Sequence, residues 1–241
     1  MKIIGVIPAR YGSSRLPGKP LLDIGGKSLI RRVYEQALKS KLLTQVIVAT
    51  DDKRIYDAVF SFGGEAVMTS KRHRSGTDRI VEAVKDIKCD VVVNVQGDEP
   101  FIDPRDIDKT IQPLIKSSKV NVSTLAVRIK DLKELKDTNA VKMIFDKDAD
   151  AIYFSRGIIP YSGSPDVRKN KYYKHIGLYA YRKDFVIKFA KAKQSELEKI
   201  EKLEQLRILE MGEKIKVIVT KNDSLGVDTR QDLARARKMV K

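Results

Sequence analysis

The residues best suited to chemistry lie in the first twenty positions of the chain. Residues 3–7 form an apolar run that predicts a buried strand, and they lead into a segment rich in glycine, serine and cations. Small residues let backbone N–H groups approach an anion, which Arg10, Arg15 and Lys19 would neutralise. The segment is therefore typical of a loop that binds a polyphosphate and stabilises charge on departing phosphate oxygens.

Two familiar phosphate-binding loops do not fit this segment. Five residues separate Gly12 from Gly18, and Pro20 stands where a Walker loop carries the Ser or Thr that binds magnesium. The glycine spacing of a dinucleotide-binding loop, G-x-G-x-x-G, does not occur here either. An ordinary surface loop of the same composition is the alternative, and the preceding strand favours the phosphate-binding interpretation.

Two aspartates could supply a metal site beside this loop. Asp98 follows the apolar run 90–95 after a glycine, and Asp228 follows a second predicted strand. Magnesium prefers one or two carboxylates together with phosphate oxygens, so the pair could hold Mg²⁺ on a nucleotide. Asp98 could instead bond its own backbone in a turn, and Asp228 could cap the last helix. Convergence of both carboxylates on one phosphate loop explains them better than two coincidences.

His175 lies in a run that alternates between two kinds of side chain. Ile176, Leu178 and Ala180 would share one face of a strand. His175 would share the other face with two tyrosines and Gly177, a polar and aromatic surface that suits a hydroxyl-rich ligand. A histidine that merely packs on the sheet is the equal alternative.

Composition excludes several classes of protein. The hydrophobic content of 42% is ordinary for a folded chain, and Cys89 is the single cysteine, which fits a reducing cytoplasm. Only His73 and His175 are histidines, so a metal would need oxygen ligands. No run approaches the roughly 20 apolar residues that a membrane span requires, and residues 1–10 do not resemble a signal peptide.

The formal net charge of +16 favours anionic partners, either phosphorylated small molecules or nucleic acid. The basic residues are mostly interleaved with acidic ones, as in residues 196–204, and no basic arm or zinc-finger spacing is present. A solvated, densely charged surface is therefore favoured over nucleic-acid binding. A basic nucleic-acid-binding protein stays the alternative from another functional class.

Strands and helices alternate through the first half of the chain, which predicts an α/β fold with a mostly parallel central sheet flanked by helices. The predicted strands are 3–7, 45–50, 65–67, 90–95, 122–127, 140–145, 151–154, 175–181 and 215–219. Helices are predicted after residues 28, 52, 79 and 103, over 183–191, after Ser195, and from about Gln231 onward. Because the second half is more mixed, we expect one domain over residues 1–241, with an excursion at about 141–181.

Eight sequence blocks are specific enough to indicate a family. The blocks are Ile7-Pro-Ala-Arg-Tyr-Gly-Ser-Ser-Arg-Leu-Pro-Gly-Lys-Pro20, Ala49-Thr-Asp-Asp52, Ser75-Gly-Thr-Asp-Arg79, Asn94-Val-Gln-Gly-Asp-Glu-Pro100, Tyr153-Phe-Ser-Arg156, His175-Ile-Gly-Leu-Tyr-Ala-Tyr-Arg182, Leu203-Glu-Gln-Leu-Arg207 and Val227-Asp228. With these blocks the chain resembles the 3-deoxy-D-manno-octulosonate (Kdo) cytidylyltransferase family, and the similarity covers residues 3 to about 233. Asp78 is a small departure, since the family more often has Glu there. Sialic-acid cytidylyltransferases share the first block.

This resemblance implies a Rossmann-like, nucleotide-diphospho-sugar transferase fold and a set of site residues. The triphosphate would be held by Arg10, Ser14, Arg15 and Lys19. Cytosine or ribose would be approached by Ala9, Ser75 and Gln96. Magnesium would be held by Asp98 and Asp228. The sugar site would be lined by Arg156, His175, Glu204 and Gln205.

The resemblance further implies a cytoplasmic, Mg²⁺-dependent homodimer that serves lipopolysaccharide biosynthesis. The anomeric hydroxyl of Kdo would attack the α-phosphorus of CTP, giving CMP-Kdo and pyrophosphate. The 141–181 excursion would contribute to the sugar site and the dimer interface. The sequence does not separate Kdo from 8-amino-Kdo or a sialic-type acid as the substrate.

Overall fold

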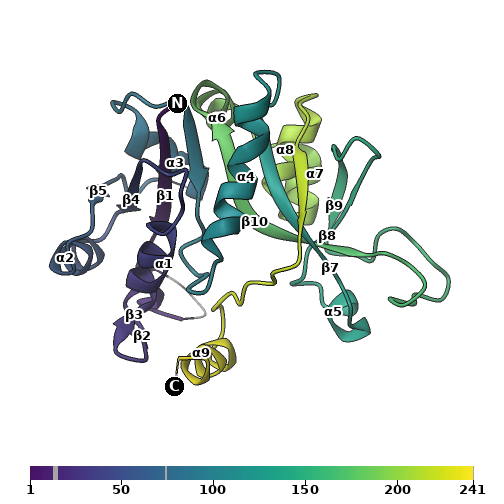
Figure 1. Cartoon of the computed structure of the whole chain (residues 1–241), viewed down its shortest axis with the longest axis horizontal. Helices are drawn as coiled ribbons and strands as arrows, with labels where there is room; N and C mark the ends of the chain where they lie inside the picture. Colours follow the sequence, from purple (N-terminus) through teal and green to yellow (C-terminus); the bar gives the residue numbers. More distant parts are fainter. Residues whose placement is uncertain (13–15, 74, 241) are drawn as a thin grey trace.

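A computed structural model describes residues 1–12, 16–73 and 75–240 of the chain (Figure 1). Ser14 and Arg15, two predicted triphosphate ligands, lie outside the described residues. Among the described residues, no helix is long and apolar enough to cross a membrane.

A central mixed sheet organises the molecule (Figure 1). Its strands run in the order β11-β7-β10-β6-β1-β4-β5, and β8 and β9 extend it beside β10. The bounds are β1 Ile3–Ala9, β4 Gln45–Thr50, β5 Ala66–Met68, β6 Val91–Asn94, β7 Val122–Arg128, β8 Lys142–Phe145, β9 Ala151–Ser155, β10 Tyr173–Arg182 and β11 Lys216–Thr220. A short hairpin pairs β2 (Asp23–Ile24) with β3 (Lys27–Ser28).

Strand direction confirms the predicted fold class. The pairs β1–β4, β1–β6, β4–β5 and β7–β11 are parallel, whereas β10 is antiparallel to β6, β7 and β8. The parallel half places the carboxyl ends of β1 and β6 side by side, the position where open α/β sheets bind ligands. The predicted strands all occur, with ends that differ by a few residues.

Helices cover both faces of the sheet (Figure 1). The helices are α1 Leu29–Ala37, α2 Lys53–Ser61, α3 Gly76–Val84, α4 Pro104–Lys116, α5 Leu132–Lys136, α6 Lys183–Lys191, α7 Glu196–Glu201, α8 Gln205–Glu210 and α9 Arg230–Lys238, with a 3₁₀ turn, η1, at Lys19–Leu21. Polar caps fix several starts, and Asp52 and Ser75 accept backbone N–H bonds at the starts of α2 and α3.

Two hydrophobic cores lie on opposite faces because side chains alternate along each strand. In β1, Ile3 and Ile7 join the core with α1, α2, α4 and α9, whereas Ile4 and Val6 join the core with α3, α6 and α8. β6 contributes to both cores in the same way, which explains its continuous valine run.

One sequence expectation for the C-terminal region was wrong. Asp228 does not follow a strand directly: β11 ends at Thr220, and an irregular segment, residues 221–229, connects it to α9. We call this segment the strap, and Figure 1 shows it running as an irregular yellow trace from the middle of the molecule to α9 at the lower edge. Thr229, and not Asp228, caps α9, because its hydroxyl accepts the Asp232 backbone N–H.

Candidate active site

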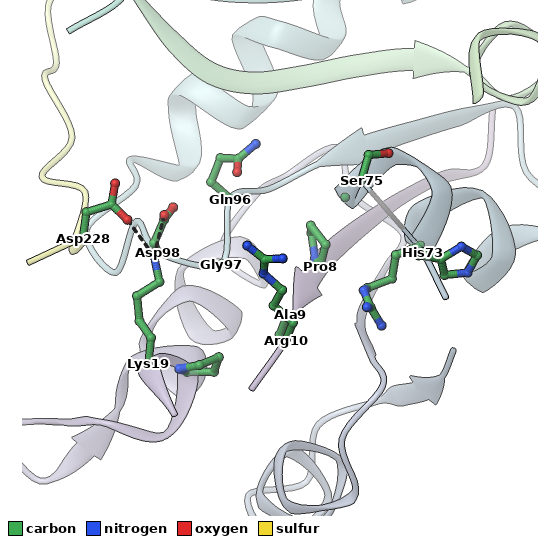
Figure 2. Close-up of a pocket in the computed structure, with 13 residues that line it drawn as sticks. Pro8, Ala9, Arg10, Lys19, His73, Ser75, Gln96, Gly97, Asp98 and Asp228 are labelled. Carbon is green, nitrogen blue, oxygen red and sulfur yellow. Dashed lines mark hydrogen bonds and ion pairs between the residues drawn. The ribbon is translucent and has the colours of Figure 1, made fainter. Parts of the chain in front are cut away.

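A cavity of about 390 Å³ opens at the carboxyl ends of β1 and β6 (Figure 2). Its walls include seven of the predicted site residues, namely Ala9, Arg10, Lys19, Ser75, Gln96, Asp98 and Asp228. Sequence reasoning did not assign a role to Pro8, Pro20, His73, Gly76, Arg79 and Gly97, which also line it. The Ser-Gly-Thr-Asp-Arg block carries the signal for two of these, since its glycine and arginine face the same cavity as its serine.

Lys19 joins the two predicted metal ligands (Figure 2). Its Nζ lies 2.9 Å from Asp98 Oδ2 and 2.9 Å from Asp228 Oδ1. Burial alone would lower the pKa of Lys19, but the two carboxylates outweigh it and raise that pKa above its usual value. The ammonium is therefore a fixed positive charge at the centre of the site.

Backbone contacts explain how these three residues meet. Gly18 adopts a left-handed conformation (φ 66°), and its N–H donates to the Tyr11 carbonyl, which folds Lys19 back toward the cavity. The strap is held beside β6 by the Val227 N–H, which donates to the Asp98 carbonyl at 2.8 Å. A main-chain bond thus holds the strap to the end of β6, and the ion pairs of Lys19 join the Gly18 turn to both.

Gly97 permits the close approach of two chain segments. A Cβ atom at this position would lie 2.7 Å from the Pro8 carbonyl oxygen, a contact that would force the backbone to move. The Gly-Asp pair after β6 therefore has a steric origin, because only glycine lets Asp98 follow so close to β1.

The donor set fits a magnesium ion that a nucleotide helps to hold. Asp98 and Asp228 already converge on a single cation, the Lys19 ammonium, and both side chains are partly exposed. No group of three or more His, Cys, Asp or Glu that could hold a metal is found in the described part of the chain. Two carboxylates completed by phosphate oxygens match the coordination that Mg²⁺ prefers.

Glu99 is a further acidic group at this edge. Burial, assisted by the negative charge of Asp98, raises the pKa of Glu99 to about 8. A carboxyl with this pKa is largely protonated at neutral pH, so it adds little negative charge beside the phosphate loop. Sequence reasoning had no signal for this effect, which depends on tertiary burial.

Arg79 reinforces the opposite wall. The side chain is 5% exposed, and its guanidinium donates to Asp51 Oδ2 at 2.7 Å and to Thr69 Oγ1 at 2.5 Å. These bonds connect α3 to the ends of β4 and β5. Ser75 caps the same helix, and the Asp78 carboxylate accepts the Ser75 N–H, so aspartate completes the capping box here.

The predicted sugar residues lie apart from the first cavity. His175 packs against Thr124, Phe154 and Tyr179, and we call these four residues the β10 seam. A hydrogen bond of 2.7 Å from Gln96 Nε2 to the Gly177 carbonyl connects the cavity wall to β10 beside the seam. The polar and aromatic face predicted for His175 is therefore present. Gln96 connects this face to the cavity through its bond to Gly177.

Glu204 borders a second hollow of about 680 Å³ that shares Ser75 with the first. Thr77 Oγ1 donates to Glu204 Oε2 at 2.7 Å, and burial raises the pKa of this carboxyl above its usual value. Gln205, the next predicted sugar residue, is 8% exposed at the start of α8 and lines neither hollow.

Arg156 lies farther out, after the end of β9. Its Nε donates to the Glu201 carbonyl and its Nη1 to the Thr138 carbonyl, each at 3.0 Å. These bonds connect the β9 end to α7 and to the segment before β8. Arg156 lines neither hollow in the described structure.

The sheet order, the cationic cavity at the strand ends and the paired aspartates define a nucleotidyltransferase. A family model described as cytidylyltransferase matches residues 4–215. A 3-deoxy-manno-octulosonate cytidylyltransferase of Syntrophus aciditrophicus is 48% identical over 242 residues, 99% of this chain and 97% of that protein. The chain belongs to the 3-deoxy-manno-octulosonate cytidylyltransferase family.

Solved structures agree with this placement. CMP:2-keto-3-deoxy-manno-octonic acid synthetase complexed with CTP superposes with a TM-score of 0.94 at 44% identity, covering 99% of this chain and 98% of that one. A 4-diphosphocytidyl-2C-methyl-D-erythritol synthase of Anaerococcus prevotii gives a TM-score of 0.65 at 18% identity, covering 99% and 98% of the two chains, and shows a shared fold.

Proposed function

We propose that the chain couples CTP to 3-deoxy-D-manno-octulosonate, giving CMP-Kdo and pyrophosphate for lipopolysaccharide biosynthesis. The observation that carries the proposal is the convergence of Lys19, Asp98 and Asp228 at the strand ends. Lys19 and Arg10 face one cavity there, so both can pair with an anionic triphosphate. The names and identities of the relatives support CTP and Kdo as the two substrates.

In the proposed reaction, the anomeric oxygen of Kdo forms a bond to the α-phosphorus of CTP and releases its proton to solvent. The bond from the α-phosphorus to the bridging oxygen of pyrophosphate breaks. Lys19 and Arg10 stabilise the negative charge that grows on the leaving phosphate oxygens. Gln96 and Ser75 line the wall where the base or ribose would lie.

We propose Mg²⁺ as the cofactor, held by Asp98 and Asp228 together with phosphate oxygens of CTP. When bound, this ion would supply Lewis-acid neutralisation of the phosphates. On CTP binding, Lys19 would then exchange its carboxylate partners for phosphate oxygens. Partial exposure of all three side chains supports such an exchange, because each can be reached by a ligand.

We also propose that the protein is a cytoplasmic homodimer whose contact surface includes the 141–181 excursion. Two large side chains are exposed there, Ile152 at 54% and Tyr161 at 89%. Consumption of CTP supports the cytoplasm as the compartment. Sedimentation equilibrium tests the dimer: Ile152→Lys should shift the mass toward the monomer, whereas Ile200→Lys, on α7 outside the excursion, should not.

Pyrophosphate release from a substrate panel tests the activity. The four nucleoside triphosphates are combined with Kdo, 8-amino-Kdo and a sialic acid, each with and without Mg²⁺. We expect release only with CTP, and fastest with Kdo. No Kdo-dependent release in any combination would contradict the proposed function. Faster turnover of another acid would change the substrate and keep the reaction class.

Substitution of the predicted sugar residue His175 separates the two substrates. We expect His175→Ala to raise the KM for Kdo more than the KM for CTP, because His175 lies on β10 and outside the cavity of Lys19. Initial rates at varied concentrations of each substrate measure both constants. The reverse order would place His175 on the nucleotide side.

A further inference from the structure

The Thr124 hydroxyl has a single hydrogen, but several polar groups lie within hydrogen-bond distance of its oxygen. Thr124 is completely buried in β7. Its Oγ1 lies 3.0 Å from His175 Nε2, 2.9 Å from the Leu178 carbonyl oxygen and 3.2 Å from the Ile176 carbonyl oxygen. A single O–H group therefore meets two carbonyl acceptors and one ring nitrogen, and the Tyr179 hydroxyl also interacts with the Thr124 side chain.

This arrangement determines which atom carries each hydrogen. Carbonyl oxygens only accept, and a hydroxyl donates one hydrogen while its lone pairs accept. If Thr124 donated to the ring, its oxygen would face two carbonyl oxygens with no hydrogen between them. Thr124 therefore donates to the carbonyl of Leu178 or Ile176, and His175 Nε2 must be the N–H that donates to Thr124.

The pairing of the strands explains why these two carbonyls face the Thr124 hydroxyl. The pairing of β10 with β7 shifts register between Ile176 and Tyr179, so the regular ladder is interrupted at this point. The carbonyls of Ile176 and Leu178 turn to Thr124, and that of Gly177 accepts from Gln96. Hydrogen bonds at the register shift thus connect Gln96 of the cavity wall, the carbonyls of β10 and the Thr124–His175 pair.

The surroundings also keep His175 uncharged. The Phe154 ring lies edge-on at 5.1 Å and the Tyr179 ring at 5.3 Å. Burial lowers the pKa of His175 to about 3. At neutral pH the imidazole has one hydrogen, and since this is on Nε2, Nδ1 is an unprotonated acceptor.

We propose that Thr124 is a positioning residue that holds His175 as the neutral Nε2–H tautomer, so that His175 accepts a hydroxyl hydrogen of the sugar acid through Nδ1 and does not bind its carboxylate. The inference rests on the proposed function, which brings the sugar acid to His175. As a whole residue, His175 keeps part of its surface exposed. Thr124 acts through His175 and does not itself touch the substrate.

Imidazole ¹⁵N NMR tests the tautomer directly, because the chain contains only two histidines. His73→Gln assigns the spectrum. We expect His175 to show the Nε2–H pattern from pH 8 to below pH 5, and to stay neutral when the site is saturated with Kdo. An Nδ1–H pattern, or an imidazolium at pH 6 with or without Kdo, would overturn the proposal.

Two substitutions at Thr124 provide a matched pair. Thr124→Val replaces the hydroxyl by a methyl group of similar size, and Thr124→Ser restores the hydroxyl. We expect Val to mix the two tautomers and to raise the KM for Kdo about tenfold, the effect of one lost hydrogen bond, with the KM for CTP unchanged. Ser should keep both the tautomer and the KM for Kdo close to wild type.

The outcomes separate this proposal from the proposed function. If the wild-type protein is inactive but shows the Nε2–H tautomer, the proposed function is contradicted. The role of Thr124 in setting the tautomer of His175 is then still supported. An active wild-type protein in which Thr124→Val changes neither tautomer nor KM for Kdo would overturn the role of Thr124. If Val fails to fold, the wild-type and Ser spectra still decide the tautomer.

Discussion

At the cavity, the Lys19 ammonium lies between two carboxylates, whereas along β10 the Thr124 hydroxyl meets an uncharged imidazole. Lys19 and its two carboxylate partners are partly exposed, whereas the Thr124 side chain is completely buried. Desolvating a charge costs far more than burying a polar group that is fully hydrogen-bonded. At this cavity the charges therefore stay where ligands and water can reach them, whereas the hydrogen bonds of the Thr124 hydroxyl lie inside the sheet.

The two regions also differ in how the chain builds them. The cavity collects side chains from η1, the end of β6 and the strap. The β10 seam uses neighbouring strands of one sheet, β7, β10 and the β8–β9 hairpin. The cavity therefore depends on side chains from segments far apart in the sequence, whereas the seam depends on the pairing of neighbouring strands.

The largest effect is expected for Asp98→Asn. Loss of this carboxylate removes one of the two proposed protein ligands of the metal, so kcat for Mg²⁺-dependent pyrophosphate release should fall about 10³-fold. The circular dichroism spectrum and the melting temperature should stay close to wild type. Asp57→Asn, which removes an exposed carboxylate paired with Lys53 on α2, is the matched control and should keep full activity. An unimpaired rate in Asp98→Asn would contradict the metal assignment.

Replacement of the central cation tests the charged region in a second way. Lys19→Met should lower kcat/KM for CTP about 100-fold, because a charge that pairs with phosphate is lost. Without nucleotide, the same variant should bind Mn²⁺ more tightly than wild type, since the ammonium no longer competes for Asp98 and Asp228. Electron paramagnetic resonance measures free Mn²⁺, and the exposed Lys53→Met is the control. Equal Mn²⁺ binding by variant and wild type would exclude this competition.

A pair of glycine substitutions tests the backbone that positions Asp98. Gly97→Ala places a Cβ 2.7 Å from the Pro8 carbonyl oxygen, so we expect a loss of about 1–3 kcal/mol in the free energy of unfolding. Gly226→Ala, on the strap, meets no heavy atom within 4 Å and should be nearly neutral. Urea denaturation measures both variants. Equal stability of the two would show that the β1–β6 approach is not tight.

The last effect concerns acid stability and the neutral region, and it arises only below about pH 6.5. His175 has a folded-state pKa of about 3 against 6.5 for a free imidazole, so between these values the unfolded chain binds more protons. Stability should therefore fall as pH drops from 6.5 toward 3, by at most about 1.4 kcal/mol per pH unit from this group. His175→Gln should flatten that part of the profile. Identical slopes in both proteins would place the ring in a more polar setting.

Local pattern was sufficient to predict much of the fold. The uniform apolar run of β6 indicated a strand buried on both faces, and Asp52 and Ser195 were recognised as helix starts. The strap was not recognised, because residues 221–229 carry no periodic apolar signal. Its role depends on contacts with residues far away in the chain, such as Val227 with Asp98.

The candidate site was predicted to a similar extent. Cations after a buried strand pointed to the cavity, and Lys19 lies in it. Arg156 was placed by resemblance only, and its guanidinium donates to two backbone carbonyls. Glu99 and Thr124 were not singled out, because an acid after aspartate or a threonine in a strand has no special pattern. Their properties come from burial and from neighbours on other elements.

By itself, the sequence determined the α/β alternation, the two buried faces of the strands, and the charges available at the first loop, because these depend on spacing within a few residues. Only the tertiary structure decided that Lys19 meets Asp98 and Asp228, which lie 79 and 209 positions away. It likewise decided that Thr124 meets a register shift in β10 and lies within hydrogen-bond distance of the His175 ring. Such contacts arise from packing of distant segments, and no local period encodes them.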